Sequence, residues 1–577
     1  MLDPSAHLDR FARDHLPPPE QWPVFDGGGL AGLDYPKRLN AAVELLDRMV
    51  EKGFGARPCL RRETVQWKQI IEPDGHHPVA YPEAGTEIWS YADLLERANR
   101  IANVLVTELG LQPGERVLLR DANTPMMAAC WFAVLKAGGI AVGTMPLLRA
   151  RELRYIIDKA KVRYALCAED LGTELDAARG QTATLEKLVL FRSERPDGLE
   201  ARMARQLPRF ANVITSHDDV ALIAFTSGTT GAAKGTMHFH RDLLAICDCF
   251  PKLLTLGPDD IFCGSPPLAF TFGLGGLLLF PMRVGASTLL LPKVTAEGLL
   301  QAIQRHRCSV CFTAPTLYRA MAELAHNFNL ASLKTCVSAG ETLPLPVFEA
   351  WQRATGIKIV DGIGSTEMLH IFISAAGDEI RPGATGKAIP GYQAMVVDES
   401  GNPVPPNTIG RLAVRGPTGC RYLDMPEQQQ KYVQNGWNLT GDAYRCDEDG
   451  YFWYQARTDD MIVSAGYNIS GPEVEAALLD HPKVLECAVV GSPDSERGEI
   501  VKAFVVLRSG TAADEATRTA LQEHVKAVIA PFKYPRAIEF VSALPRTETG
   551  KIQRFRLREE ERAGAAKAPP SAPSSRG

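Results

Sequence analysis

The sequence lacks any stretch suited to secretion or membrane insertion. The N-terminal segment has no apolar core of the kind that a signal peptide needs. The longest apolar segment, residues 268–282, is interrupted by glycine and threonine and is too short to span a bilayer. Long basic runs are absent too, and the formal net charge is −5. We therefore expect a cytoplasmic protein that binds neither a membrane nor nucleic acid.

A zinc or redox motif is also nearly missing. The twelve cysteines are scattered, and only Cys308 and Cys311 stand close together, with no second Cys/His pair at ligand spacing. The apolar run around this pair is typical of a strand, in which residues three apart point to opposite faces. The sequence favours core packing of these thiols in a reducing compartment, with a redox or zinc pair as the alternative.

The length of 577 residues exceeds what one hydrophobic core supports, so we expect two or three domains. Ser90 is expected to cap a helix that runs to about residue 105. Beyond it, helix-like and strand-like patterns alternate, which is typical of parallel α/β layers. The predicted strands cover residues 114–119, 138–143, 164–167, 220–225, 309–313, 334–338 and 360–364, and the predicted helices cover 126–136, 150–160 and 316–324.

Changes of pattern mark the remaining parts of the chain. Short alternating runs with Gly/Pro turns at 394–455 predict a small antiparallel β subdomain. Helix and strand patterns then predict a compact α+β unit of about 100 residues. The predicted organisation is a large N-terminal domain of layered α/β subdomains, a hinge, a small C-terminal domain and a disordered Ala/Pro/Ser-rich tail. Their ranges are 1–456, 457–460, 461–562 and 563–577.

A glycine- and hydroxyl-rich loop follows the apolar strand at 220–225. Residues 226–235 contain three glycines, four hydroxyl side chains and one lysine. Such a turn brings backbone amides and hydroxyls close to phosphate oxygens, and a lysine adds a positive charge. The common P-loop is excluded because Ala233 and Gly235 flank Lys234. We predict a nucleotide-phosphate loop, with a plain Gly/Thr turn as the alternative. Its predicted binding residues are Thr226, Ser227, Gly228, Thr229, Thr230, Gly231 and Lys234.

This loop resembles the phosphate loop of the adenylate-forming superfamily, which contains acyl- and aryl-CoA ligases, peptide-synthetase adenylation domains and luciferases. Ala233 stands where that family usually has proline. Further matches follow in family order from about residue 85 to residue 556. The resemblance implies an α/β enzyme with a mobile C-terminal domain. It also implies that ATP and Mg²⁺ convert a carboxylic acid into an acyl-adenylate. The thiol of coenzyme A then takes the acyl group and AMP leaves, without any protein nucleophile.

Two segments resemble the signatures that carry catalysis in that superfamily. At 364–367 the resemblance implies that Thr366 contacts the α-phosphate and that Glu367 ligates Mg²⁺, a hard cation that prefers carboxylate and phosphate oxygens. A helix cap is the alternative for this segment. At 545–551 it implies that Lys551 bridges the acid and the α-phosphate, which lowers the repulsion between two anions. A surface lysine in a turn is the alternative there.

The resemblance extends to the nucleoside, the hinge and coenzyme A. It implies that Asp442 accepts both ribose hydroxyls and that Arg457 makes a second ribose or phosphate contact, although a plain Gly-Asp turn is an alternative for Asp442. Asp459 matches the hinge, where a surface aspartate without a role is the alternative. The remaining matches are Gly340 and Glu341 along adenine, and Gly466, Tyr467 and Trp437 at the pantetheine tunnel.

Two pocket segments resemble benzoate-CoA and 2-aminobenzoate-CoA ligases. Ala269 and Phe270 stand where many fatty and aryl ligases have an aromatic–histidine pair, and Ile363 replaces a common aromatic residue. The resemblance implies an apolar box for a flat ring, in which a histidine meets an ortho substituent or the carboxylate. Ordinary core packing of these side chains is the alternative. The predicted box residues are Phe270, Thr271, Phe272, Ile363 and His370.

We therefore predict an ATP-dependent aryl-CoA ligase for a small aromatic acid of the benzoate or 2-aminobenzoate type. An alicyclic or medium-chain acyl-CoA ligase is the nearest alternative, because an apolar box does not sharply reject a ring of similar size. A stand-alone adenylation enzyme and a nucleotide-binding protein without turnover are further alternatives. Peptide-synthetase adenylation is disfavoured, since no anion for a substrate ammonium stands at 268–280. The assembly considered is a homodimer.

Overall fold

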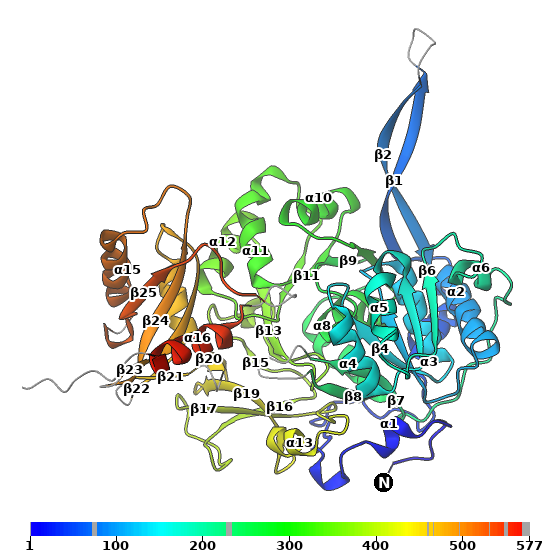
Figure 1. Cartoon of the computed structure of the whole chain (residues 1–577), viewed down its shortest axis with the longest axis horizontal. Helices are drawn as coiled ribbons and strands as arrows, with labels where there is room; N and C mark the ends of the chain where they lie inside the picture. Colours follow the sequence, from blue (N-terminus) through cyan, green and yellow to red (C-terminus); the bar gives the residue numbers. More distant parts are fainter. Residues whose placement is uncertain are drawn as a thin grey trace, which may run out of the picture.

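The computed structural model describes residues 2–71, 78–226, 233–457, 461–464, 467–494, 497–529, 531–546 and 552–567. Three sheets make up the larger, N-terminal part, and a fourth sheet belongs to the C-terminal unit at the left of Figure 1. The predicted layered α/β architecture with a small α+β C-terminal domain is confirmed. Among the described helices, none has the length and apolar composition to cross a membrane.

The six-stranded sheet carries the first part of the predicted alternation. Its order is β6-β5-β3-β4-β7-β8, and only the edge strand β8 runs antiparallel to its neighbour. Its strands are β3 (Arg116–Arg120), β4 (Ile140–Thr144), β5 (Tyr164–Ala168), β6 (Lys187–Phe191), β7 (Val220–Phe225) and β8 (Gly235–Phe239). Its connecting helices include α3 (Pro125–Lys136), α4 (Ala150–Ala160) and α5 (Gly172–Arg179). The predicted helix at 150–160 has the observed bounds, because its apolar positions Leu153, Ile156, Ile157 and Ala160 are its buried face.

The nine-stranded sheet has the order β15-β14-β13-β12-β11-β9-β10-β1-β2. Its strands are β1 (Pro58–Ile71), β2 (Pro78–Ser90), β9 (Ile261–Gly264), β10 (Ser287–Leu290), β11 (Val310–Thr313), β12 (Thr335–Ser338), β13 (Ile359–Gly364), β14 (Ile371–Ser374) and β15 (Lys387–Ala388). Its helices include α10 (Ala296–His306), α11 (Pro315–Leu324) and α12 (Leu345–Thr355). The antiparallel pair β1–β2, which the sequence did not predict, projects far from the body (Figure 1).

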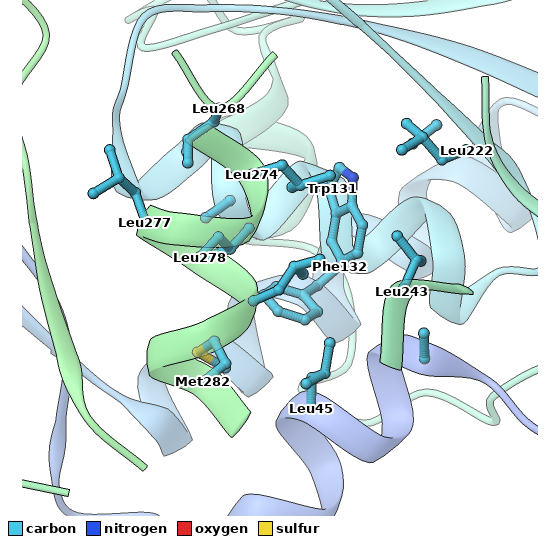
Figure 2. Packing of buried hydrophobic residues seen from close by; sticks show 14 of the residues in the cluster. Leu45, Trp131, Phe132, Leu222, Leu243, Leu268, Leu274, Leu277, Leu278 and Met282 are labelled. Atoms are coloured by element: carbon cyan, nitrogen blue, oxygen red, sulfur yellow. The ribbon is translucent and has the colours of Figure 1, made fainter. Parts of the chain in front are cut away.

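The main core lies between these two sheets. Helix α2 (Tyr91–Asn103) begins with the predicted cap, since Ser90 and Asp93 form a reciprocal capping box. The segment α8–η7–α9 (Thr271–Leu274, Gly275–Leu279, Phe280–Val284) packs against α3, and Figure 2 shows Phe132 among Leu45, Leu278 and Leu243. Burying each such side chain contributes about 1.5–3 kcal/mol. This packing fixes the segment that carries two predicted box residues, Thr271 and Phe272, and that directly follows a third, Phe270.

The predicted antiparallel β subdomain is confirmed. Its strands are β16 (Gln393–Val397), β17 (Ile409–Arg415), β18 (Val433–Gln434), β19 (Trp437–Cys446) and β20 (Phe452–Arg457), with α13 (Pro426–Tyr432) before β18. Asn435 and Gly436 both have positive φ, at 51° and 78°, in the two-residue turn between β18 and β19. Asn-Gly favours this turn, because its right-handed twist requires positive φ at both positions.

The C-terminal unit contains β21 (Ile462–Ser464), β22 (Tyr467–Ile469), α14 (Gly471–Leu479), β23 (Val484–Asp494), β24 (Gly498–Leu507), α15 (Glu515–Val528), β25 (Ala537–Phe540) and α16 (Arg554–Lys567). Helix α16 overlaps the start of the tail that the sequence predicted to be disordered from residue 563. That prediction is wrong for 563–567, because alanine and lysine are strong helix formers and continue the helix. Residues 568–577 lie outside the described residues.

The cysteine pair corrects a second expectation. Cys308 and Cys311 belong to the same core cluster, together with Cys263 and Cys336, and do not point to opposite faces. Strand β11 begins at Val310, so Cys308 precedes it and the alternation of a strand does not apply. All twelve cysteines lie in described residues and are free thiols. Core packing of this pair is therefore what the structure shows.

Candidate active site

The predicted phosphate loop connects the two antiparallel strands β7 and β8. Phe225 pairs with Gly235 at its base. The Thr226 backbone N–H donates to the Lys234 carbonyl at 3.0 Å, and the Lys234 N–H donates to Thr226 Oγ1 at 3.4 Å. Residues 227–232 lie outside the described residues, so the structure places the loop by its two ends.

The segment after β13 is fixed against β8. The Thr366 carbonyl lies 2.8 Å from His238 Nε2, and Glu367 Oε1 accepts a hydrogen bond from the Tyr422 hydroxyl at 2.5 Å. His238 belongs to β8, and Tyr422 forms an antiparallel bridge with Thr236 of the same strand. The helix-cap alternative is wrong, because within the continuously described residues 233–457 no helix begins near Thr366.

Glu367 therefore lies close to the end of the phosphate loop. The Lys234 ammonium is 5.4 Å from the centroid of the Tyr422 ring, whose hydroxyl contacts Glu367. Glu367 is 8% exposed, and the bond from Tyr422 engages one of its two carboxylate oxygens. A carboxylate next to bound phosphates is the donor set that Mg²⁺ takes in proteins. The residues present thus fit a magnesium ion bound together with ATP.

Asp442 and Arg457 pair across β19 and β20. Arg457 Nη1 donates to Asp442 Oδ1 at 2.9 Å and to the Thr440 carbonyl at 3.0 Å. Gly441, which precedes Asp442, has φ +76°, a backbone conformation that glycine adopts without strain. The plain-turn alternative for Asp442 is wrong, because this residue lies within the strand.

Tyr432 joins this pair to the Glu367 segment. Its hydroxyl lies 3.2 Å from Ser365 Oγ, and its ring centroid is 5.8 Å from that of Tyr422. Burial, followed by the charge of Glu367 and more weakly that of Asp442, raises the pKa of Tyr432. The two predicted nucleotide contacts, Glu367 and Asp442, therefore border one site.

The residues predicted to lie along adenine, Gly340 and Glu341, follow β12, which pairs with β13. Gly340 has φ +91°, and Glu341 accepts a hydrogen bond from Thr316 Oγ1 at 2.6 Å. Ser338 and Asp361 are register partners on these two strands. Asp361 Oδ1 and Ser338 Oγ are buried near each other, and neither makes a hydrogen bond of good geometry among the described residues. Burial raises the pKa of Asp361 to about 7.

His370 lies in an aromatic cage. Its ring centroid is 4.6 Å from that of Phe280, 5.6 Å from Phe250 and 5.7 Å from Phe272. Among the described residues neither ring nitrogen makes a hydrogen bond of good geometry, although the Phe272 backbone lies beside the imidazole. Burial lowers the pKa of His370 to about 3, so the imidazole is neutral at physiological pH. A neutral imidazole offers one donor and one acceptor to a ligand.

The five predicted box residues fall into separate groups. Phe272 lies with His370, whereas Phe270 and Thr271 line a cavity of about 10 Å³ on the side of Trp131. Thr271 and Phe272 are consecutive residues of the short helix α8, so their side chains point in different directions. Ile363 pairs with Ile373 at the β13–β14 edge and is partly buried against the main core.

The remaining predicted residues belong to the C-terminal unit or its border. Lys551, Asp459 and Gly466 lie outside the described residues. Tyr467 is in β22, whereas Trp437 is in β19 beneath the Arg415 guanidinium, at 4.6 Å from its ring centroid. Arg546 and Ile552 form an antiparallel bridge with each other. Arg546 binds Glu486 at 2.9 Å on β23.

Comparison with known families decides the assignment. Residues 72–422 match the family described as AMP-binding enzyme, and residues 473–551 match the family described as AMP-binding enzyme C-terminal domain. The chain belongs to the AMP-binding enzyme family. This is the adenylate-forming superfamily that the phosphate loop predicted, so that prediction is confirmed.

Relatives within the AMP-binding enzymes cover nearly the whole chain. The benzoate–CoA ligase of Thauera aromatica is 36% identical over 534 residues, which is 91% of this chain and 97% of that protein. A mitochondrial acyl-coenzyme A synthetase of Homo sapiens is 36% identical over 560 residues, covering 92% of this chain and 96% of that protein. The solved structure of the anthranilate CoA ligase AuaEII with anthranoyl-AMP has a TM-score of 0.84 and 34% identity, covering 93% and 100% of the two chains.

The family also bears out the predicted cofactors. CoA ligases among the AMP-binding enzymes use ATP, Mg²⁺ and coenzyme A. The class that the family and these relatives support is an acid–thiol ligase that forms AMP.

Three side chains of this AMP-binding enzyme were missed by sequence reasoning. His238 and Tyr422 contact the Thr366–Glu367 segment from 128 and 55 residues away in the chain, which no local motif reveals. Asp361 did have a signal, since it is a lone carboxylate within the apolar strand Ile359–Gly364. A buried acidic residue of this kind points to a ligand-binding site.

Proposed function

We propose that this AMP-binding enzyme joins a small aromatic acid, benzoate or 2-aminobenzoate, to coenzyme A. The observation that supports the aromatic substrate best is the neutral, buried imidazole of His370 beside the rings of Phe272 and Phe280. Aromatic walls suit a flat ring, and one polar group within them orients it. Relatives named for benzoate and anthranilate support the same substrate class.

The first half-reaction forms the acyl-adenylate. A carboxylate oxygen of the acid attacks the α-phosphorus of ATP, and the bond to pyrophosphate breaks. In the proposal Thr226, Lys234 and Thr366 hold phosphate oxygens, Glu367 holds Mg²⁺, and Lys551 balances the charge of the approaching anions. Mg²⁺, when bound, neutralises part of the triphosphate charge. The rest of the phosphate loop acts with Lys234: Ser227, Gly228, Thr229, Thr230 and Gly231.

In the proposal, residues on β19 and β20 bind the ribose, and residues at the ends of β12 and β13 bind adenine. Asp442 accepts the ribose hydroxyls while Arg457 keeps its carboxylate in place at 2.9 Å. Gly340, which has no side chain, and Glu341 line the adenine face. Asp361 is proposed to accept a hydrogen bond from the adenine amino group, because its Oδ1 is a buried acceptor that makes no hydrogen bond of good geometry in the described residues.

The second half-reaction transfers the acyl group to the thiol. The sulfur of coenzyme A attacks the activated carbonyl carbon, and AMP leaves with its phosphate oxygen. We propose that the domain at 461–562 turns about Asp459 between the two steps, so that Gly466 and Tyr467, with Trp437 opposite, line the pantetheine path. The enzyme is proposed to work in the cytoplasm, with a homodimer as the assembly to test.

The neutral imidazole of His370 is proposed to read the ortho position of the ring. Its acceptor nitrogen matches the N–H of 2-aminobenzoate, and an apolar wall would leave that donor unpaired at a cost of about 1–3 kcal/mol. Benzoate has no such donor and fits the aromatic cage alone. The proposal therefore expects 2-aminobenzoate to equal or exceed benzoate as a substrate.

A substrate panel tests the function. CoA-dependent AMP release is measured with benzoate, 2-aminobenzoate, 2-hydroxybenzoate, cyclohexanecarboxylate and a medium-chain fatty acid. The last two acids test the second candidate, an alicyclic or medium-chain ligase, which the relative from Homo sapiens favours. Pyrophosphate exchange without CoA-ester formation would instead indicate a stand-alone adenylation enzyme.

A further inference from the structure

Tyr422 contacts the carboxylate to which the cation is assigned. Its hydroxyl donates to Glu367 Oε1 at 2.5 Å, and Tyr422 is 1% exposed while Glu367 is 8% exposed. A phenol has one proton to donate. When that proton is on Oε1, the lone pairs of Oε2 remain available to a cation and the carboxylate plane is held in one orientation.

The backbone around Tyr422 is held rigidly beside the phosphate loop. The N–H of Met237 donates to the Arg421 carbonyl, and the N–H of Leu423 donates to the Gly235 carbonyl, both at 2.8 Å. The Tyr422 N–H in turn donates to Gln429 Oε1 at 2.9 Å. Residues 421–423 thus extend the sheet along β8, whose first residue ends the loop.

A buried ion pair fixes the residue before Tyr422. Arg421 Nη1 donates to Asp242 Oδ2 at 2.8 Å, and both side chains are fully buried. The Arg421 guanidinium also lies 3.8 Å from the centroid of the Phe239 ring. Removing one partner of such a pair is strongly destabilising, so the pair helps to hold this segment in place.

The Tyr422 ring also lies within cation–π range of Lys234. The Lys234 Nζ is 5.4 Å from the ring centroid. One side chain therefore contacts a proposed phosphate ligand and the proposed metal ligand.

We propose that Tyr422 is a positioning residue that orients the Glu367 carboxylate for the divalent cation of the ATP complex. The inference rests on the proposed function. Hydrogen-bond partners of metal-ligating side chains set the orientation and basicity of those ligands, and losing one weakens metal affinity by about 10- to 100-fold. Tyr422 acts through Glu367 and does not touch the reacting atoms.

Tyr422→Phe tests this, because it removes one oxygen and keeps the ring. Tyr432→Phe is the matched control: its ring is a neighbour at 5.8 Å, but its hydroxyl contacts Ser365 and not Glu367. Mn²⁺ binding in the presence of a non-hydrolysable ATP analogue is titrated by electron paramagnetic resonance. We expect Y422F to bind Mn²⁺ about 10- to 100-fold more weakly than wild type, and Y432F to bind within about 3-fold of wild type.

Binding of the same analogue without metal separates positioning from a general structural effect. Positioning predicts that Y422F retains metal-free affinity, whereas damage to the site would weaken both measurements. Equal Mn²⁺ affinity in Y422F and wild type overturns the inference and leaves the proposed function standing. Failure of the wild-type chain to bind Mn²⁺ with the analogue would instead overturn the proposed function.

A second measurement needs no variant. A crystal structure of the wild-type chain with Mn²⁺ and the analogue provides this measurement. We expect the anomalous peak of Mn²⁺ within coordination distance of Glu367 Oε2, and we expect the Tyr422 hydroxyl to keep its hydrogen bond to Oε1. Mn²⁺ bound to Oε1 with the hydroxyl displaced would overturn the inference even if Y422F did not fold.

Discussion

Replacing Gly275 with alanine tests whether the cage around His370 holds the substrate. A Cβ at Gly275 would lie 2.4 Å from His370 Cδ2, closer than Cβ atoms in proteins approach a neighbour, and 3.1 Å from Phe280 Cζ, which is a tight contact. The imidazole must move, yet Phe250 and Phe272 already pack around it at centroid distances of 5.6 and 5.7 Å. Overpacking of this kind costs about 1–3 kcal/mol.

If this cost raises the free energy of the transition state with the bound acid, Gly275→Ala lowers kcat/KM by about 5- to 150-fold, since 1.36 kcal/mol corresponds to a factor of ten. Initial rates of CoA-ester formation with benzoate and 2-aminobenzoate, at saturating ATP and coenzyme A, measure the loss. Gly257→Ala is the control, because nothing lies within 4 Å of a Cβ at that position. A folded G275A enzyme with wild-type kcat/KM for both acids would refute the placement of the acid beside His370.

Three further outcomes test the proposed site. His370→Ala is expected to lower kcat/KM for 2-aminobenzoate more than for benzoate, because only the first acid loses a hydrogen-bond partner; an equal loss would assign His370 to the carboxylate or the fold. Lys551→Ala is expected to slow adenylate formation by about 100-fold or more while sparing thioester formation from supplied acyl-adenylate, and equal losses in the two half-reactions would contradict its role. Burial raises the pKa of Asp361 from 3.8 to about 7, so the native state binds more protons than the unfolded state and stability falls as pH rises between these values. Asp361→Asn should reduce that fall in melting temperature from pH 4 to pH 8, and an unchanged pH profile would mean that Asp361 does not ionise in this way.

The elements of the fold were predictable where local sequence and burial agree. Helix α4 and the cap at Ser90 were found because apolar residues at helical spacing and a capping side chain are local signals. The β1–β2 ribbon was missed because the beginning of β1 contains Arg61, Arg62 and Glu63, which interrupt any apolar alternation. The end of the folded C-terminal unit was placed too early, since composition alone does not show that a helix continues to Lys567.

In the candidate site, too, residues within short motifs were predictable from the sequence, whereas contacts between distant residues were not. Motif residues such as Asp442 and Glu367 were found from short matching segments, and they border one site in the structure. Tyr422 was missed because its contact with Glu367 spans 55 residues and depends on how the chain returns along β8. The separation of Thr271 from Phe272 depends on the direction of each side chain in α8, which the order of residues alone does not specify.

The projecting ribbon indicates which part of the enzyme is open to change in length. Strand β1 pairs with β10 only at Leu60, Arg61 and Arg62, and further along it pairs with β2 alone. A two-stranded ribbon by itself is at best marginally stable in water. Glu63 and Thr86 are register partners, so a two-residue turn could join them in place of residues 64–85. The ribbon is thus an appendage to the nine-stranded sheet, and we expect that its length can change without altering the strands that end at the proposed nucleotide site.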